Sequence, residues 1–233
     1  MIRTLFALLL CPPLLAQGAA LRGGQGGMLA RAEARAGAEV SICHGYGCVR
    51  EDVVRFQAAT LARVGERLAA ARSAAEERAL LAEAVGQLYR VAGTQTPVGA
   101  DRAGNLLDAE IHGRMDCIDH ATSTTRLLAL VEARGWLRHH RVLEPARRTR
   151  LILQHFSAVV EVLTVEERIA RLPPGQALAG CNCTEDGRVI EDADGGGRPG
   201  ERYVVDSWFV DNGEPAVVLP LAEWLNGGGP NVQ

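Results

Sequence analysis

Residues Gly113–Ala121 carry the sequence GRMDCIDHA, which has the features of a helix start. Asp116 suits the N-cap position, and Asp119, three residues further on, suits the reciprocal position of a capping box. Apolar side chains then recur at helical spacing, at Leu127, Leu128, Leu130 and Val131. Because Gly135 follows as a stop signal, the pattern predicts a helix through residue 132 with Cys117 at its first position.

Cys117 has two interpretations. In the first turn of a helix, unpaired backbone N–H groups and the positive end of the helix dipole stabilise a thiolate, so this cysteine is a candidate nucleophile with a lowered pKa. Free cysteine is also among the most frequently buried residue types, and Cys117 could simply belong to the core. The local sequence leaves both interpretations open.

The composition is that of an ordinary globular protein. The chain has 233 residues, 47% of them hydrophobic and 23% charged, with a formal net charge of −3. This length suits one sizeable domain or two small ones. The charge argues against a nucleic-acid-binding or anionic-membrane surface. All 25 basic residues are arginine, which excludes Schiff-base chemistry on a lysine.

The N-terminus predicts a secretory signal peptide over residues 1–20. Arg3 supplies a positive start, residues 4–15 form an apolar run, and residues 16–20 are mostly small and suited to cleavage. The apolar run is too short to span a membrane comfortably, and two prolines interrupt it. We therefore expect a periplasmic or secreted protein that is not an integral membrane protein.

Residues 21–48 are predicted to be a flexible lead that ends in a cysteine loop, CHGYGC at Cys43–Cys48. In an exported chain, two cysteines five positions apart around glycines favour a disulfide. Cys181 and Cys183 form a second pair, so cross-bridging between the pairs and a zinc site built from both are open alternatives. Neither pair has the two-residue spacing usual for zinc ligands, and disulfides of some connectivity are the favoured prediction.

Residues 49–233 are predicted to form a single domain whose helical part covers residues 49–105. Apolar residues keep a three-to-four spacing from Val49 to Val91, and Ser73 with Glu76 fits a capping box between two helices. The pattern predicts a helical hairpin. Residues 93–105 contain glycine, proline and threonine and are predicted to be a loop.

The periodicity changes after the central helix, within the core segment at residues 106–225. Alternating and β-branched residues predict strands at Trp136–Leu143, Leu151–Val165, Arg202–Val205 and Val217–Leu219. Pro145 and neighbouring arginines predict a basic turn over residues 144–150, and residues 166–172 predict a helical turn. The predicted fold class is α+β, with the cysteine-bearing helix packed on an antiparallel sheet.

A nucleophilic cysteine needs an imidazole within hydrogen-bond reach and an acceptor that fixes the imidazole tautomer. Among six histidines, His155 alone begins a long apolar strand, where a rigid element would hold it. His120, one turn after Cys117, is expected on the helix surface. Asp206 ends another strand, and the following Ser207-Trp208 could shelter a His–Asp pair from water. Cys117, His155 and Asp206 are therefore the candidate catalytic residues.

Three segments together resemble the motifs of the transglutaminase-like superfamily, most closely those of the bacterial transglutaminase-like cysteine proteinases. They are DCIDHA at Asp116–Ala121, HFSAVVEV at His155–Val162 and YVVDSW at Tyr203–Trp208. The resemblance covers residues 113–224, about half of the chain. Any one of the segments alone would be a weak signal.

The resemblance implies a papain-like core in which Cys117 is the nucleophile, His155 the base and Asp206 the orienting acid. It implies hydrolysis of a peptide bond in a protein or peptide substrate through a thioester. Two alternatives are open: amide transfer on the same site, and a non-catalytic, disulfide-stabilised envelope protein that keeps the fold.

Calcium is the one metal that the resemblance raises. Periplasmic members of the family that release surface adhesins carry an acidic residue directly after the cysteine, and their acids there bind calcium. Here that residue is Ile118, so Asp116 and Asp119 are only weak calcium candidates. We expect calcium to bind poorly, and we predict no required cofactor.

Overall fold

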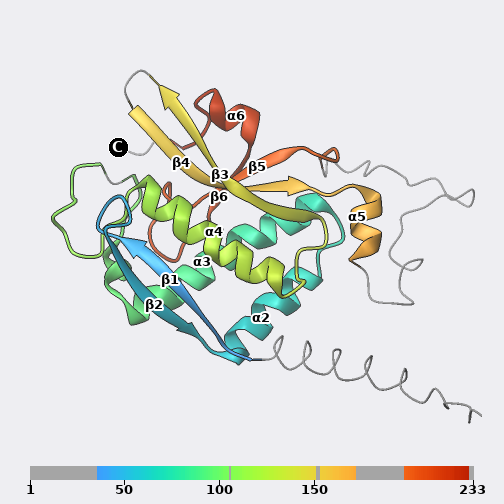
Figure 1. The fold of residues 1–233 in the computed structure, drawn as a ribbon, viewed down its shortest axis with the longest axis horizontal. Helices are drawn as coiled ribbons and strands as arrows, with labels where there is room; N and C mark the ends of the chain where they lie inside the picture. The colour runs from blue at the N-terminus through green and yellow to red at the C-terminus, as the bar shows by residue number, and fades with distance from the viewer. Residues whose placement is uncertain (1–35, 105, 151–152, 172–196, 231–233) are drawn as a thin grey trace, which may run out of the picture. The chain divides into compact units, whose positions relative to one another are not determined.

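The computed structural model describes residues 36–104, 106–150, 153–171 and 197–230. The described residues from Gly37 onward belong to one compact unit that combines helices with two antiparallel sheets, in agreement with the predicted α+β class (Figure 1). The predicted signal peptide and the pair Cys181 and Cys183 lie outside the described residues. Within the described part, no helix is long and apolar enough to cross a bilayer.

The first sheet is a hairpin of β1 (Ala38–His44) and β2 (Arg50–Phe56). Here the prediction is wrong: β1 lies in the predicted flexible lead, and β2 lies where the first turns of a helix are predicted. Burial along β2 has a period of two, because Val54 and Phe56 are buried while Val53 is 60% exposed. Two adjacent valines fit helical and alternating spacing equally, and pairing with β1 selects the alternating one.

The predicted helical hairpin consists of α2 (Ala58–Ala69) and α3 (Ala74–Gln95). Ser73 is the N-cap of α3, and its hydroxyl accepts the Glu76 N–H at 3.2 Å. The Glu76 carboxylate accepts the N–H of the residue before Ser73, so only the serine half of the predicted capping box is present. The helix continues into the predicted loop and is followed by a 3₁₀ turn, η1 (Pro97–Ala100).

The predicted central helix is α4 (Cys117–Ala133), with Cys117 as its first residue. The Asp116 carboxylate accepts the N–H groups of the second and third helical residues, at 3.0 and 2.9 Å. The Asp119 carboxylate accepts the Asp116 N–H at 3.1 Å, which confirms the capping box. The chain leaves the helix through Gly135 at φ +70°, a left-handed conformation that glycine adopts without steric cost.

In the part of the chain that the structure describes, the second sheet has four antiparallel strands in the order β3-β4-β5-β6, and all four predicted strands are present with shifted ends. The strands are β3 (His140–Arg150), β4 (Leu153–Val162), β5 (Arg202–Asp206) and β6 (Val217–Pro220). Two short helices, α5 (Val165–Ala170) and α6 (Leu221–Leu225), follow β4 and β6 respectively. The predicted helical turn after β4 is therefore confirmed as α5.

The basic turn predicted over residues 144–150 is wrong, because these residues continue β3. β3 is an edge strand, and its register against β4 shifts between Leu143 and Ala146. Pro145 lies within this shift, where its missing N–H costs no regular ladder bond. The arginines of this segment therefore extend along the sheet instead of around a turn.

The central helix α4 lies between the two sheets (Figure 1) and packs against β1 and against β3, β4 and β5. Its fully buried apolar side chains are Leu127, Leu128 and Val131. They share a core with Ala158 and Val160, which lie on one face of β4. The opposite face of β4 carries His155 and Val159, and Val159 packs in a second cluster with Trp224 of α6.

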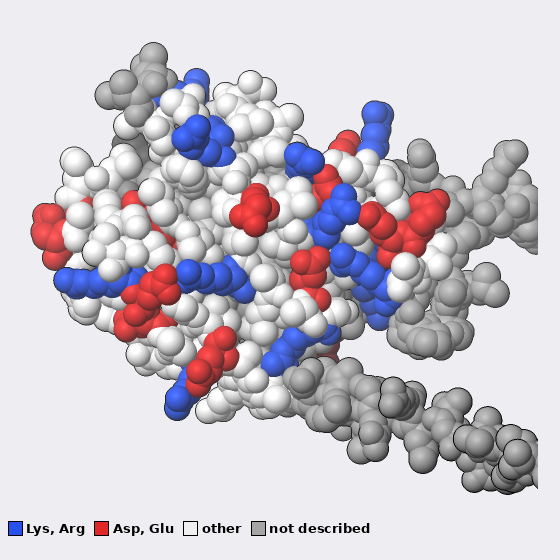
Figure 2. Space-filling model, viewed as in Figure 1, with Lys and Arg blue, Asp and Glu red and all other residues white. Residues whose placement is uncertain are grey.

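On the face seen in Figure 2, basic and acidic side chains are interspersed. Several charged groups of the described chain are paired across elements, as Glu161 is with both Arg141 and Arg202. This face therefore offers no extended surface of one sign to attract a polyanion.

Candidate active site

His155 and Asp206 are in direct contact. His155 lies on β4 and Asp206 at the end of β5, and the imidazole Nε2 lies 2.7 Å from Oδ2 of the carboxylate. Asp206 is buried, and it also accepts the indole N–H of Trp224 at 2.9 Å and the backbone N–H of Trp208 at 3.2 Å. The carboxylate in turn fixes Nε2 as the protonated ring nitrogen and leaves Nδ1 as the acceptor.

Three aromatic side chains surround the His155 imidazole. The ring centroids of Trp208, Phe209 and Trp224 lie 4.7, 5.4 and 5.5 Å from that of the histidine. These apolar surroundings strengthen the hydrogen bond to Asp206. The sequence predicts the shelter by Trp208, but it misses Trp224, because only the packing of α6 on β5 brings that ring to the site.

Cys117 lies beside the segment of β4 that carries His155. Its Sγ is 3.8 Å from the carbonyl oxygen of Gln154, and the N–H of Phe156 also hydrogen-bonds to the sulfur. β5 pairs with β4 only at residues 158–161. Among the described strands, none therefore pairs with the peptide groups next to His155 on the β5 side of β4. The start of α4, with Cys117, lies beside them instead.

Cys117 and His155 line one cavity of about 340 Å³. Its walls also include the apolar side chains of Leu106, Leu153 and Trp208 and the arginines Arg148 and Arg150. The structure thus brings two of the three predicted catalytic residues to a common cavity, with the third hydrogen-bonded behind the histidine. A cavity of this volume can hold a side chain together with a short stretch of peptide.

Burial raises the pKa of the Cys117 thiol to about 11. The carboxylates of Asp116 and Asp206 contribute to this increase, while the Phe156 N–H favours the thiolate and opposes it. The lowered pKa predicted from the helix start is therefore wrong, because the loss of solvent outweighs the nearby N–H groups. The thiol is protonated at neutral pH, and a base has to take its proton before the sulfur can act as a nucleophile.

The cysteine loop contains the predicted disulfide, between Cys43 and Cys48. The four residues 45–48 all have positive φ, at +83°, +69°, +70° and +58°, and Tyr46 and Cys48 among them are not glycine. Such residues carry strain that surrounding contacts must offset. The two sulfurs and an Asp119 oxygen lie within 4.8 Å of one another, but in the disulfide the sulfurs are not the thiolates that zinc requires.

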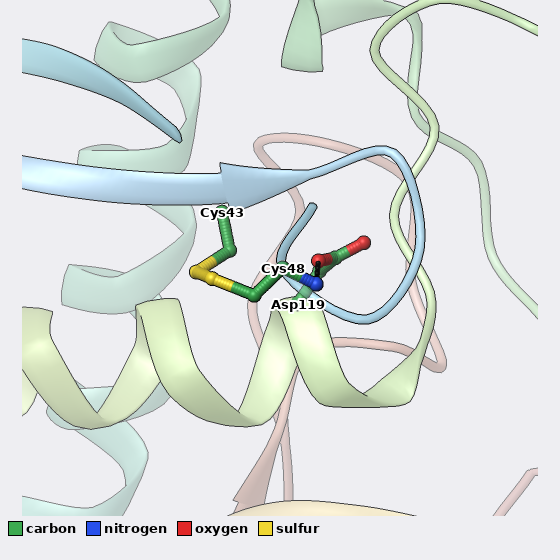
Figure 3. Close-up of side chains that lie close together, drawn as sticks. All are labelled: Cys43, Cys48 and Asp119. Carbon is green, nitrogen blue, oxygen red and sulfur yellow. Dashed lines mark hydrogen bonds between the residues drawn. A yellow bond between two sulfur atoms is a disulfide. The ribbon is translucent and has the colours of Figure 1, made fainter. Parts of the chain in front are cut away.

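Asp116 and Asp119, the weak calcium candidates, fasten this loop to the start of α4. Asp119 accepts the Cys48 N–H at 2.6 Å, as Figure 3 shows, and the Tyr46 N–H at 2.8 Å. Asp116 accepts the Gly47 N–H at 3.0 Å. With the helix-capping bonds included, all four carboxylate oxygens accept backbone N–H groups. A calcium ion would have to compete with these donors. Burial raises the pKa of Asp119, and the charge of Asp116 adds to the increase.

His120 is buried, so the prediction that it lies on the helix surface is wrong. Its Nε2 lies 2.9 Å from a carboxylate oxygen of Asp101, and its Nδ1 lies 2.8 Å from the hydroxyl of Ser207. That hydroxyl lies 2.8 Å from the hydroxyl of Thr124. Because Ser207 follows Asp206, this polar cluster joins α4 to the end of β5. Helical spacing could have revealed this cluster in the sequence, because His120 and Thr124 are four residues apart and share a face of α4.

Comparisons with protein-family models, with curated proteins and with solved structures give no match to this chain. The resemblance to the transglutaminase-like superfamily therefore rests on the three sequence motifs. What the structure adds is the arrangement of the residues that these motifs contain.

Proposed function

We propose that this protein is an exported cysteine hydrolase with a transglutaminase-like, papain-like core, and that it cleaves peptide amide bonds. The observation that carries the proposal is the cavity shared by Cys117 and His155, with Asp206 hydrogen-bonded to the imidazole Nε2. A nucleophile, a base and an orienting acid, each from a different element, suit covalent catalysis at an amide. The disulfide in the cysteine loop supports an exported location.

In the proposed first half-reaction, Nδ1 of His155 takes the Cys117 proton as Sγ attacks the substrate carbonyl carbon. An S–C bond forms and the carbonyl π electrons move to oxygen. The Cys117 N–H, which has no acceptor within the helix, is the candidate donor to this oxyanion. The imidazolium then gives its proton to the leaving amine as the C–N bond breaks, and a thioester remains.

In the second half-reaction, His155 takes a proton from water as the water oxygen attacks the thioester. The C–S bond breaks, the carboxylic acid leaves, and the sulfur regains its proton from the imidazolium. Asp206 stays ionised and stabilises the imidazolium in both halves. The raised pKa of the Cys117 thiol fits proton transfer coupled to attack better than a resting thiolate. If an amine replaces water in this half, the same site performs amide transfer.

The non-catalytic envelope protein is the alternative with an observation in its favour. Reactive cysteines generally have a lowered pKa, whereas the pKa of Cys117 is raised to about 11. On this alternative, the contact between His155 and Asp206 would only stabilise the sheet. Measurements of Cys117 thiol reactivity and of peptide cleavage distinguish the hydrolase from the non-catalytic protein.

The decisive experiment is incubation of the purified mature protein with a proteome-derived peptide mixture, with and without added methylamine, read by mass spectrometry. The wild type is expected to produce new carboxyl termini, or methylamides if it performs transfer. Cys117→Ser and His155→Ala should abolish both products. His112→Ala, which alters an exposed histidine outside the cavity lining, should retain them. The proposal fails if the wild type gives neither product.

A further inference from the structure

Arg148 and Arg150 lie on the same face of the sheet as His155. In the antiparallel register of β3 and β4, Arg148 is directly opposite His155, and Arg150 is opposite Leu153. Directly opposed residues of antiparallel strands project to the same side, and residues two apart on one strand do so too. Both arginines line the cavity that contains Cys117. Arg147, opposite Phe156, projects to the other side.

Neutral groups hold Arg148 in place. Its guanidinium donates to the backbone carbonyl oxygens of Trp224 and Gly228 and lies 4.6 Å from the centre of the Trp224 ring. Burial lowers the pKa of Arg148, and the charge of Arg150 adds to this effect, while Asp206 opposes it. The nearby Asp206 is itself occupied by N–H groups of His155, Trp224 and Trp208. A fixed positive charge is thus presented to the cavity.

Arg150 is exposed and lies against Gly227, where φ is +95° and a side chain would collide with the guanidinium. Within the ranges that the structure describes, no carboxylate forms an ion pair with Arg148 or Arg150. Among the described residues that line the cavity, Asp116 is the one acidic residue, and its oxygens already accept backbone N–H groups. Two like charges close together in a partly apolar cavity repel each other, and an anion between them would relieve this repulsion.

We propose that this cavity selects a substrate that carries a carboxylate beside the bond to be cleaved. The inference rests on the proposed function, and it names the substrate class. A guanidinium fork matches a carboxylate in geometry and charge. Leu106, Leu153 and Trp208 supply apolar contacts for the rest of the substrate. The carboxylate can belong to an internal aspartate or glutamate side chain or to a free peptide C-terminus.

The test compares the alkylation of Cys117 by iodoacetate and by iodoacetamide, which differ in having a carboxylate or a neutral amide. In both reactions an S–C bond forms, the C–I bond breaks, iodide leaves and the thiol proton is lost. The ratio of the two rate constants at one pH cancels the thiolate fraction. It therefore reports anion preference even if a substitution changes the pKa of Cys117. Peptide mapping by mass spectrometry assigns the label to Cys117.

The ratio for the folded protein is expected to exceed that of the urea-unfolded chain by about tenfold, the effect of one hydrogen bond to a charged group. Arg148→Met should remove most of this preference, and Arg148→Lys should retain part of it. Arg147→Met is the matched control, with the same charge loss on the other face, and should change the ratio by less than about twofold. If Arg148→Met fails to fold, Arg150→Met, which alters an exposed side chain, carries the test.

The outcomes separate this inference from the proposed function. A ratio that does not depend on Arg148 or Arg150 overturns the inference even if the protein cleaves peptides. A ratio that depends on them supports the anion site even if no peptide is cleaved, in which case only the proposed function fails. Matched peptides with an internal glutamate, an internal glutamine, a free C-terminus or an amidated C-terminus then identify the source of the carboxylate. Equal cleavage of all four would also contradict the inference.

Discussion

Asp119 provides a direct test of how the cysteine loop is held against α4. Its buried carboxylate accepts three backbone N–H groups, from Tyr46, Cys48 and Asp116. The substitution Asp119→Asn keeps the shape of the side chain but replaces one acceptor oxygen with an NH2 donor. Because Oδ1 accepts one N–H and Oδ2 accepts two, the amide nitrogen should take the Oδ1 position. There it would face the Cys48 N–H, donor against donor.

The size of the effect follows from these bonds. A hydrogen bond to a charged group contributes about 1.5–3 kcal/mol, and a buried donor without an acceptor costs about 1–3 kcal/mol. Part of this loss is offset, because the neutral amide avoids the desolvation that raises the pKa of Asp119. We therefore expect Asp119→Asn to lower the free energy of unfolding by about 2 kcal/mol. For a domain of this size, that corresponds to a decrease in Tm of about 4–8 °C.

Urea and thermal unfolding of the oxidised protein, followed by circular dichroism, measure this change. The control is Glu39→Gln, which removes an exposed carboxylate from an ion pair with Arg55 and should cost less than about 0.5 kcal/mol. Repeating Asp119→Asn in a Cys43→Ser, Cys48→Ser background tests whether the disulfide and the carboxylate hold the same loop, since shared support gives non-additive losses. A loss no larger than that of Glu39→Gln would refute the reasoning.

Other parts of the molecule lead to further predictions. Because the pKa of the Cys117 thiol is raised to about 11, its rate of alkylation by iodoacetamide should keep increasing from pH 9 to pH 11; a rate that levels off below pH 8 would contradict the burial argument. Asp206→Asn should lower kcat for peptide cleavage on the order of 10²–10⁴-fold, less than Cys117→Ala, since the nucleophile and the base remain; an unchanged kcat would exclude the orienting role. His120→Ala should lower the free energy of unfolding in urea by about 2–4 kcal/mol, because Asp101 and its neighbours lose a buried partner; a loss below about 1 kcal/mol would show that the cluster contributes little. Edman sequencing of the native protein should start near Leu21, and a native chain that retains its first residue would contradict export by a cleaved signal peptide.

The helix that bears the cysteine could be predicted because its boundary signals are local. Asp116 and Asp119 cap each other across three residues, and Gly135 ends the helix by its own backbone conformation. Contacts over such short separations depend little on the rest of the fold. The same holds for Ser73 at the start of α3. The motifs around His155 and Asp206 could likewise be found, since each sits on a strand that its own sequence pattern predicts.

Two of the errors in secondary structure fall where two local patterns were equally consistent with the residues. Val53 and Val54 fit both a helix and a strand, and pairing with β1 decided between them. Pro145 signals a turn in most sequences, but on an edge strand with a register shift it is tolerated within β3. Strand pairing is a contact between separate segments, so no window of sequence around these residues contains the deciding information.

Local sequence signals were thus enough to predict the capped helix with Cys117 at its start and the strands that carry His155 and Asp206. They favoured disulfides among the cysteines without fixing the pairing, which the structure shows between Cys43 and Cys48. The tertiary structure alone decided the surroundings of these residues. Packing of α6 on β5 brings Trp224 to Asp206, and the register of β3 against β4 places Arg148 beside His155. The tertiary structure also decided the direction of the pKa shift of Cys117, because desolvation depends on every group that excludes water from the sulfur. The electrostatic environment of a residue, its burial and the shape of a cavity beside it depend on segments that are distant in sequence. They are therefore established only once the chain has folded.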